Sequence, residues 1–258
     1  MNKYILVDNT GPVVRLTINR PEVRNAINDG VCEELADGIR QAQASPTARA
    51  IVITGAGDRA FCAGGDLKPT SGAFGQDYSR PMSRYGELLA LAANCDLPLI
   101  ARVNGHCLAG GMGLLAMCDM AVAAEGYKFG LPETRIGMFA MQVASLMRHQ
   151  VPARQFAEMC ITGEPITTED ALRWNLINYA VPAAELDAKV DWLLDRVVRS
   201  SPTAIRRGKH ALRMIQDMTN AQAISYMSAQ LATMTFTEDS KEGIASFNEK
   251  RTPEWTGR

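Results

Sequence analysis

The sequence predicts an α/β fold that ends in a helical region. Strand-like apolar runs alternate with helical patterns over the first two thirds of the chain. From about Pro182 onward, nearly every segment has helical periodicity. The chain has 258 residues and 47% hydrophobic content, so it can bury a large core. Together these observations favour an α/β core followed by appended helices.

The first elements are a hairpin, a helix and a strand. YILVDNTGPVVRLTIN contains two runs of Val, Ile, Leu and Thr around a turn at residues 9–11, which is typical of a β-hairpin. Asn28 or Asp29 is expected to cap a helix that ends near Pro46. The apolar run at residues 50–54 then predicts a buried strand.

The middle of the chain repeats strands and helices. A helical pattern covers residues 84–94, and the apolar run at 97–103 predicts a buried strand. A glycine-containing turn at 104–111 leads into an apolar helix. Residues 120–124 predict another strand, and a short extended piece follows at 128–129.

The last part of the chain is expected to be an assembly region. Thr167-Thr168 and Ser201-Pro202 have the composition of helix starts. The segment AISYMSAQLATMTF carries more apolar surface than a solvated tail needs. We therefore expect a core over residues 1–195 and a C-terminal helical region over residues 196–258.

Composition argues against several functional classes. The net charge of -1 and the pI near 6.3 provide no electrostatic basis for binding nucleic acid or an anionic membrane. No segment reaches the roughly 20 apolar residues of a membrane span, and the N-terminus does not resemble a signal peptide. The six cysteines form no C-x-x-C pair, and the three histidines have no metal-like partner nearby. We expect a cytoplasmic protein without a metal site.

The stretch AIVITGAGDRAFCAGGDLK runs a strand into a glycine-rich loop. Gly55, Gly57 and Ala60 satisfy the G-x-G-x-x-A spacing of a dinucleotide-binding loop. Such a loop must open a helix, because the pyrophosphate sits on the N–H groups of that helix. Gly64 and Gly65 would interrupt the helix, at about 1 kcal/mol for each interior glycine. An NAD-binding oxidoreductase is therefore the weaker interpretation.

A second glycine turn has the same design as the first. In VNGHCLAGGMGLLAMCD, residues Ala109, Gly110 and Gly111 directly precede an apolar helix, so their N–H groups lie at its positive end. A backbone N–H there can donate to an anion or to a developing oxyanion. Two such turns, each after a buried strand, can place two N–H groups on one oxygen.

A carboxylate follows in FGLPETRIG. Glu133 has the apolar neighbours Phe129, Leu131 and Ile136. Apolar surroundings raise the pKa of a carboxylic acid, which suits proton transfer near neutral pH. The alternative is that Glu133 is only a carboxylate at a helix start, stabilised by the helix dipole.

These motifs, in this order, resemble the crotonase (enoyl-CoA hydratase/isomerase) superfamily. FCAGGDLK, NGHCLAGGMGLLAMCD and FGLPE follow one another at the intervals of that family. NRPEVRNAIN near the start and FNEKRTPEW near the end resemble its terminal motifs. The resemblance spans essentially the whole chain. It implies a spiral of repeated ββα units with a C-terminal helical trimerisation region.

The resemblance also implies a substrate and a set of site residues. The family binds acyl-CoA thioesters and stabilises an enolate-like oxygen with two backbone N–H groups, which correspond to Gly65 and Gly110. Glu133 corresponds to the second catalytic glutamate. Coenzyme A is part of the substrate, and no separate cofactor is implied. The positions that correspond to the coenzyme A site are Arg24, Ala26, Ala63, Asp66, Leu67, Phe247 and Lys250.

Ordinary structural roles are open for several of these residues. Gly65 and Gly110 can be plain turn glycines, and Arg24 can be a solvated surface residue. His106 precedes the second turn and is interpreted as a packed histidine rather than a catalyst. The family also implies a homotrimer or a dimer of trimers, in which the Phe247 segment sometimes serves a neighbouring subunit.

One departure from the family pattern separates the candidate activities. Fast enoyl-CoA hydratases have a first glutamate three residues after the second oxyanion glycine, where this chain has Gly113. With Glu133 as the single carboxylate, we expect an enoyl-CoA hydratase first. An enoyl-CoA double-bond isomerase is the alternative, since it needs one base only. A non-catalytic acyl-CoA-binding protein is the third interpretation.

Overall fold

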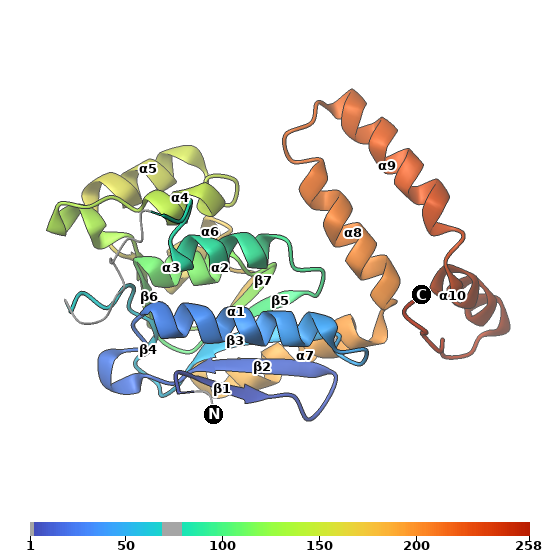
Figure 1. The fold of residues 1–258 in the computed structure, drawn as a ribbon, viewed down its shortest axis with the longest axis horizontal. Coiled ribbons are helices and arrows are strands. Elements are labelled where there is room, and N and C mark those ends of the chain that lie inside the picture. Colours follow the sequence, from blue (N-terminus) through green and yellow to red (C-terminus); the bar gives the residue numbers. More distant parts are fainter. Residues whose placement is uncertain (1–2, 69–78) are drawn as a thin grey trace.

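The computed structural model describes residues 3–68 and 79–258, and within them two β-sheets form the core (Figure 1). The larger sheet has the strand order β1-β2-β3-β5-β7-β10, and the smaller has β4-β6-β8-β9. The strands of the larger sheet are β1 Ile5–Asp8, β2 Val13–Ile18, β3 Ala50–Gly55, β5 Leu99–Val103, β7 Met120–Ala124 and β10 Tyr179–Val181. Those of the smaller sheet are β4 Ala60–Cys62, β6 His106–Leu108, β8 Lys128–Gly130 and β9 Ile166–Thr167.

The larger sheet is parallel except at one edge. β1 and β2 form the predicted antiparallel hairpin, and β2, β3, β5, β7 and β10 pair in parallel. Parallel strands are buried on both faces and read as continuous apolar runs. Along β3, Ile51 and Ile53 pack in one apolar cluster, whereas Val52 packs in another on the opposite face.

The chain alternates between the two sheets in repeated ββα units. β3 in the larger sheet is followed by β4 in the smaller one and then by helix α2, Arg84–Ala93. β5 is followed in the same way by β6 and helix α3, Gly110–Ala116. β7 and β8 lead to the 3-10 helix η3, Pro132–Ile136, and to helix α4, Met141–Met147. This arrangement confirms the expected spiral. It also places the ends of β4, β6 and β8 side by side.

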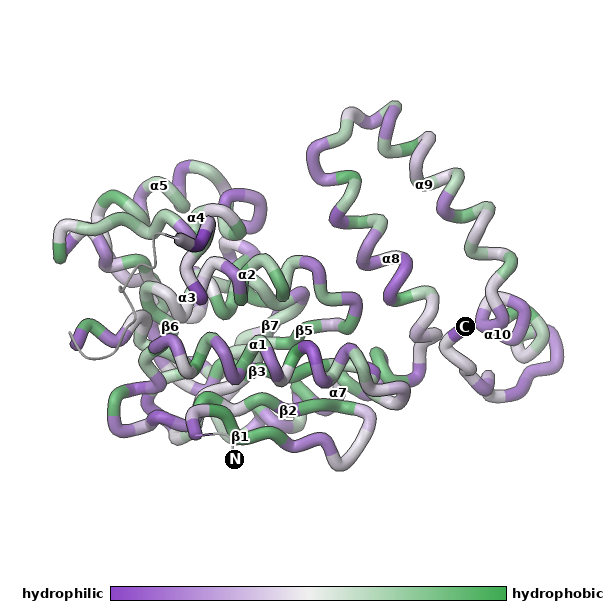
Figure 2. Tube along the Cα trace, in the orientation of Figure 1, coloured by the Kyte–Doolittle hydropathy of each residue, from purple (hydrophilic) through white to green (hydrophobic). Residues whose placement is uncertain are grey.

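Helices cover both faces of the larger sheet. Helix α1, Asp29–Ala44, packs with α2 and α3 on one face, and α7, Leu186–Arg199, packs on the other (Figure 1). Figure 2 shows hydrophobic residues along the strands between these layers. The remaining helical elements of the core are η1 Pro21–Val23, α5 Ala153–Thr162, α6 Thr168–Arg173 and η4 Ala183–Glu185.

Most elements predicted from local patterns are confirmed. Asn28 caps α1, because its side-chain oxygen accepts a hydrogen bond from the Val31 N–H at 2.9 Å. Thr167 caps α6 in a reciprocal pair with Asp170, and Ser201 caps the helix that follows it. The dinucleotide interpretation is wrong, because residues 60–62 form strand β4 where that loop requires a helix.

The helical arm leaves the core after α7. It consists of α8 Pro202–Met214, α9 Asn220–Met234 and α10 Glu238–Glu249, which extend away from the sheets (Figure 1). The expected boundary at residue 195 falls inside α7. Large apolar side chains are exposed along the arm: Ile224 is 69% exposed, Leu231 66% and Phe236 77%.

Asp239 holds the end of the chain against the start of α8. Its carboxylate accepts hydrogen bonds from the Ser201 hydroxyl at 2.8 Å, from the Thr203 N–H at 3.2 Å and from the Thr256 and Gly257 N–H groups at 2.9 Å. Burial works to raise the pKa of Asp239, but these hydrogen bonds outweigh it and lower the pKa to about 2.

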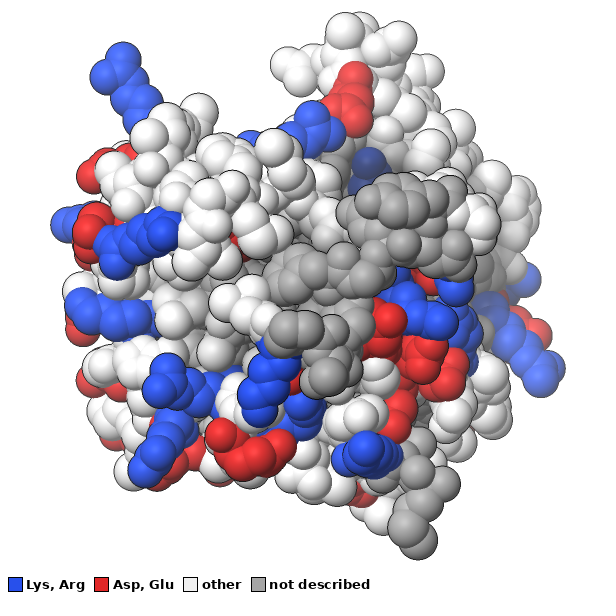
Figure 3. Space-filling view, turned by 60° about the vertical axis from the view of Figure 1, so that its left-hand side comes forward, with Lys and Arg blue, Asp and Glu red and all other residues white. Residues whose placement is uncertain are grey.

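The remaining sequence expectations concern cysteines, membranes and charge. All six cysteines are buried and free, and burial raises the pKa of Cys32 and of Cys62 to about 12. Among the residues described, no helix is both long enough and apolar enough to cross a bilayer. On the face drawn in Figure 3, basic and acidic side chains are intermixed.

Replacing Asp239 with Asn should loosen the arm. A carboxylate whose pKa is lowered on folding stabilises the folded state above its unfolded pKa, so Asp239→Asn should cost about 2 kcal/mol of unfolding free energy at pH 7. This stabilisation is lost as the pH falls from about 4 to about 2. Urea unfolding at several pH values measures it, with exposed Asp217→Asn as the control. Equal stability of the two variants at pH 7 would contradict the role of Asp239.

Candidate active site

A cavity of about 570 Å³ lies where the two glycine turns meet α2, η3 and α4. The described residues that line it come from five segments: residues 27–32, 63–67, 83–85, 109–110 and 132–143. Gly65, Gly110 and Glu133 all line it, as do Ala63 and Leu67. The fold therefore brings together residues that the sequence places more than twenty positions apart.

The first glycine loop is held by the main chain of Ile27. The Ile27 N–H donates to the Gly64 carbonyl at 2.7 Å, and the Asp66 N–H donates to the Ile27 carbonyl at 2.8 Å. Gly65 is the residue paired with Ile27 in this parallel bridge, so its own N–H takes no part in the ladder. Within the described residues, this N–H has no hydrogen-bond partner.

The second glycine turn brings a second N–H close to the first. Gly110 is the first residue of α3, so its N–H has no partner within the helix. It also has none elsewhere in the described structure. A Cβ added to Gly110 would lie 3.6 Å from the Gly65 nitrogen. Two unpartnered N–H groups at one wall of a cavity can donate to the same oxygen.

The close approach of the two turns requires two unusual backbone conformations. Gly64 has φ +100°, and a Cβ added to it would lie 2.6 Å from the Ala109 Cβ and 3.3 Å from the Gly110 nitrogen. Ala109 itself has φ +49°, a region that non-glycine residues rarely adopt. Strained backbone of this kind is concentrated at functional sites.

Glu133 faces the same cavity from η3. Pro132 begins this 3-10 helix and places Glu133 in its first turn. Burial raises the pKa of the Glu133 carboxyl group. Its Oε2 atom is buried, and it has no hydrogen-bond partner in the described structure. A half-buried carboxyl group that is left unsatisfied in a cavity is a candidate acid or base.

A second carboxylate lines the cavity, but an ion pair engages it. Asp29 lies 3.4 Å from the Nε atom of Arg84. Glu133 has no such partner among the described residues, so it is the better placed base.

Tyr85 is the site residue that the sequence analysis missed. It lies in the first turn of α2 and lines the cavity. Its hydroxyl group donates to the Gly110 carbonyl oxygen at 2.5 Å. It also lies against Gly113, where an added Cβ would collide with the Tyr85 oxygen. No local sequence signal marks this contact, because α2 and α3 meet only in the folded chain.

Three of the expected coenzyme A residues lie beside the cavity rather than in its lining. Arg24 is exposed, and its carbonyl accepts the Ala63 N–H at 3.0 Å. Ala26 is buried. Asp66 is buried and pairs with Arg20 at 2.9 Å. Burial works to raise the pKa of Asp66, but its hydrogen bonds with Arg20 and with the Lys68 N–H, together with the positive charges of both residues, outweigh burial and lower the pKa.

The other two expected residues lie on the arm. Phe247 is 83% exposed on α10, and Lys250 ends that helix in a left-handed conformation. In one copy of the chain, α10 lies far from α3 and α4 (Figure 1). His106, in contrast, is packed: its Nδ1 accepts the Lys128 N–H at 3.0 Å, and its ring meets Tyr127 edge-on.

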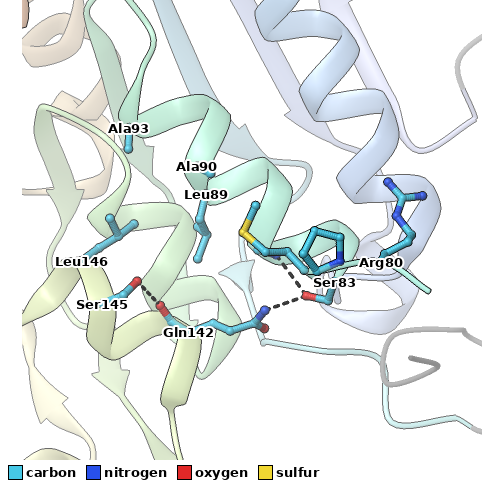
Figure 4. A pocket seen from close by; sticks show the side chains of 11 residues that line it. Arg80, Ser83, Leu89, Ala90, Ala93, Gln142, Ser145 and Leu146 are labelled. Carbon is cyan, nitrogen blue, oxygen red and sulfur yellow. Dashed lines mark hydrogen bonds between the residues drawn. The ribbon is translucent and has the colours of Figure 1, made fainter. Parts of the chain in front are cut away.

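A second cavity of about 520 Å³ adjoins the first between α2 and α4 (Figure 4). Gln142 and Ser83 line both cavities, and the Gln142 amide donates to the Ser83 hydroxyl oxygen at 2.6 Å. Leu89, Ala93 and Leu146 make the far wall of the second cavity apolar.

Comparisons with known proteins agree with this architecture. The family model described as enoyl-CoA hydratase/isomerase matches residues 8–258. The chain is 30% identical over 263 residues to a carnitinyl-CoA dehydratase of Proteus mirabilis, with 100% of both chains covered. It is 30% identical over 245 residues to enoyl-CoA hydratase domain-containing protein 3 of Xenopus laevis, covering 94% of this chain and 82% of that one.

A solved structure has the same fold over the whole chain. The enoyl-CoA hydratase of Bacillus anthracis is 29% identical, with a TM-score of 0.91 and coverage of 99% of this chain and 100% of that one. The match of the family model over nearly every residue, together with these relatives, shows the family. The chain belongs to the enoyl-CoA hydratase/isomerase family, the crotonase superfamily.

Proposed function

We propose that this protein is an acyl-CoA enzyme that stabilises a thioester enolate and adds water reversibly to a 2-enoyl-CoA. The observation that carries the proposal is one cavity that holds the N–H groups of Gly65 and Gly110 and the Oε2 atom of Glu133, none of which has a hydrogen-bond partner among the described residues. Relatives named hydratase and dehydratase support chemistry that involves water.

In the proposed mechanism, the two N–H groups stabilise the developing charge and Glu133 transfers the proton. The thioester oxygen accepts hydrogen bonds from the Gly65 and Gly110 N–H groups, and these stabilise the negative charge that develops there. Glu133 takes a proton from water while the water oxygen bonds to C3 of the substrate. The enolate then takes that proton at C2. One O–H bond breaks, C3–O and C2–H bonds form, and Glu133 returns to its carboxylate.

The environment of Glu133 suits this role. Burial raises its pKa, which makes its carboxylate a stronger base. Because Oε2 has no partner in the described structure, it is available to a water molecule or to substrate.

The double-bond isomerase is the second candidate. Gly113 provides no carboxylate, and Glu133 alone can remove a proton from C2 of a 3-enoyl-CoA and return one at C4. A non-catalytic acyl-CoA-binding protein is the third candidate, and it predicts binding without turnover of either thioester.

We assign the coenzyme A path on the same basis. Ala63 and Leu67 line the cavity and would contact the pantetheine arm. The Arg24 carbonyl and the Arg20–Asp66 ion pair hold the first loop. Ala26 and the exposed Arg24 would lie near the nucleotide end of coenzyme A. Phe247 and Lys250 would reach the site only from the arm of a neighbouring copy.

Glu133→Gln tests the central assignment. It removes the base and should lower kcat for crotonyl-CoA hydration by roughly 10²–10⁴-fold with little change in fold. Loss of the conjugated double bond measures turnover, with exposed Glu158→Gln on α5 as the matched control. In the wild type, kcat/KM should fall as the pH drops through the raised pKa of Glu133, because the base must be ionised.

The same assay separates the three candidates. Unchanged turnover in Glu133→Gln would refute the role of this residue. Conversion of a 3-enoyl-CoA without hydration of crotonyl-CoA would establish the isomerase. Binding of both thioesters without turnover of either would establish the non-catalytic interpretation.

Gly64→Ala tests the two-donor geometry. An added Cβ would press on Ala109 and displace the Gly65 and Gly110 N–H groups, so kcat should fall by roughly 10²–10³-fold. Gly57→Ala is the matched control, because Gly57 also has positive φ, at +78°, but its Cβ would meet only Pro21 at 3.6 Å. The geometry would be wrong if both variants lost the same activity.

The exposed arm is proposed to assemble the chain into a trimer or a dimer of trimers. The apolar side chains of Ile224, Leu231 and Phe236 are exposed in a single copy. Light scattering should give three or six times the chain mass of 28.1 kDa. Leu231→Glu should weaken assembly, whereas Glu158→Gln on the core should not. A monomeric wild type would refute the assembly.

A further inference from the structure

The phenol of Tyr85 occupies the space beside Gly113. Ser83 caps α2, with its hydroxyl oxygen accepting the Gly86 N–H at 3.1 Å, and so holds Tyr85 in the first helical turn. From there the ring reaches across to α3. A Cβ added to Gly113 would collide with the Tyr85 oxygen and would also lie 3.1 Å from Cζ of Tyr85 and 3.2 Å from Cγ2 of Val143. No larger side chain fits at position 113 while Tyr85 is in place.

The Tyr85 hydroxyl group donates one hydrogen bond and can still accept another. Its proton is donated to the Gly110 carbonyl oxygen at 2.5 Å. A phenolic oxygen can also accept a hydrogen bond. Burial raises the pKa of Tyr85 well above its ordinary value, so the phenol stays neutral. Tyr85 is thus an acceptor at the cavity wall and cannot serve as a base.

The site needs such an acceptor. A water molecule that attacks C3 must direct a lone pair at the carbon, which is easiest when acceptors hold both of its hydrogens. Glu133 can hold one hydrogen. Asp29 is engaged by Arg84, and position 113 has no side chain. Tyr85 lines the same cavity, and its phenolic oxygen supplies a second acceptor there.

We propose that Tyr85 is a second catalytic residue, whose phenolic oxygen accepts a hydrogen bond from the water that adds to C3 and from the 3-hydroxyl group that results. This proposal rests on the proposed hydratase function. The proton balance is unchanged: Glu133 takes one water proton and delivers it to C2, and the other stays on the new hydroxyl group beside Tyr85. Tyr85 neither gains nor loses a proton.

The proposal predicts a selective binding defect. In a Glu133→Gln background, which prevents turnover, Tyr85→Phe should lower the affinity for 3-hydroxybutyryl-CoA by about three- to tenfold. This is the contribution expected of one hydrogen bond. Butyryl-CoA has no hydroxyl group, so its affinity should change by less than about twofold. Isothermal titration calorimetry measures both affinities. Tyr127→Phe is the matched control, since the Tyr127 hydroxyl also donates to a carbonyl, that of Asp58 at 2.7 Å.

Equal weakening of both thioesters would overturn the proposal, because Tyr85 would then act only through Gly110. No weakening of either would overturn it as well. In the otherwise wild-type chain, Tyr85→Phe should also lower kcat for crotonyl-CoA hydration by about tenfold or more. If the wild type hydrates crotonyl-CoA and Tyr85→Phe leaves kcat unchanged, only this inference is refuted. A wild type that binds both thioesters but never hydrates crotonyl-CoA would refute the proposed function instead.

A space-conserving exchange provides an independent test. Gly113→Glu alone should destabilise the protein and lower turnover, because the new side chain collides with Tyr85. Tyr85→Ala removes the ring, and adding Gly113→Glu to it should restore hydration above that of Tyr85→Ala. Thermal unfolding measures the stability of the three variants, and crotonyl-CoA turnover measures their activity. A stable and faster Gly113→Glu single variant would overturn the proposal, because the phenol would not then occupy that space.

Discussion

The short backbone bridge between Ile27 and the first glycine loop is the contact on which the site depends. Two hydrogen bonds hold Gly64 and Asp66 to Ile27 and leave the N–H of Gly65 unused. Together with the bond from the Ala63 N–H to the Arg24 carbonyl, this bridge fixes the loop relative to α3, so that the two N–H groups can share an oxygen. Preorganised donors are effective because they need no reorganisation during the reaction.

The rest of the fold offsets the cost of this arrangement. Ala109 has a positive φ, two N–H groups lack partners in the described structure, and Glu133 is half-buried with a raised pKa. Each of these features costs free energy, on the order of 1–3 kcal/mol for a strained residue or an unsatisfied polar group. Strands β3, β5 and β7 of the larger sheet are buried almost completely, and β4 and β6, which pair with each other, run directly into the two glycine turns.

Two buried asparagines show how the turn before the site is positioned. Asn25 donates to the Ala56 and Ala60 carbonyls at 2.9 and 2.7 Å, and Asn104 donates to the Gly55 and Gly57 carbonyls at 2.7 and 2.6 Å. They thus donate to four carbonyl groups of the turn, of which those of Gly55 and Ala60 belong to buried residues and would otherwise lack these partners. The glycines in the G-x-G-x-x-A pattern therefore serve a tight crossing from β3 to β4 that the two amides stabilise.

The sequence by itself determined the local elements, the helix caps, the two glycine turns and Glu133. Each of these depends on neighbours within a few residues, such as Asn28 with Val31 or Thr167 with Asp170. Only the tertiary structure decided the rest. The short strands β4 and β9 have too few residues for a periodic pattern. The contacts of Tyr85 with Gly110 and Gly113 join residues that lie 25 or more positions apart in the chain. Such contacts depend on how the helices pack on the two sheets, and no local sequence pattern contains that information.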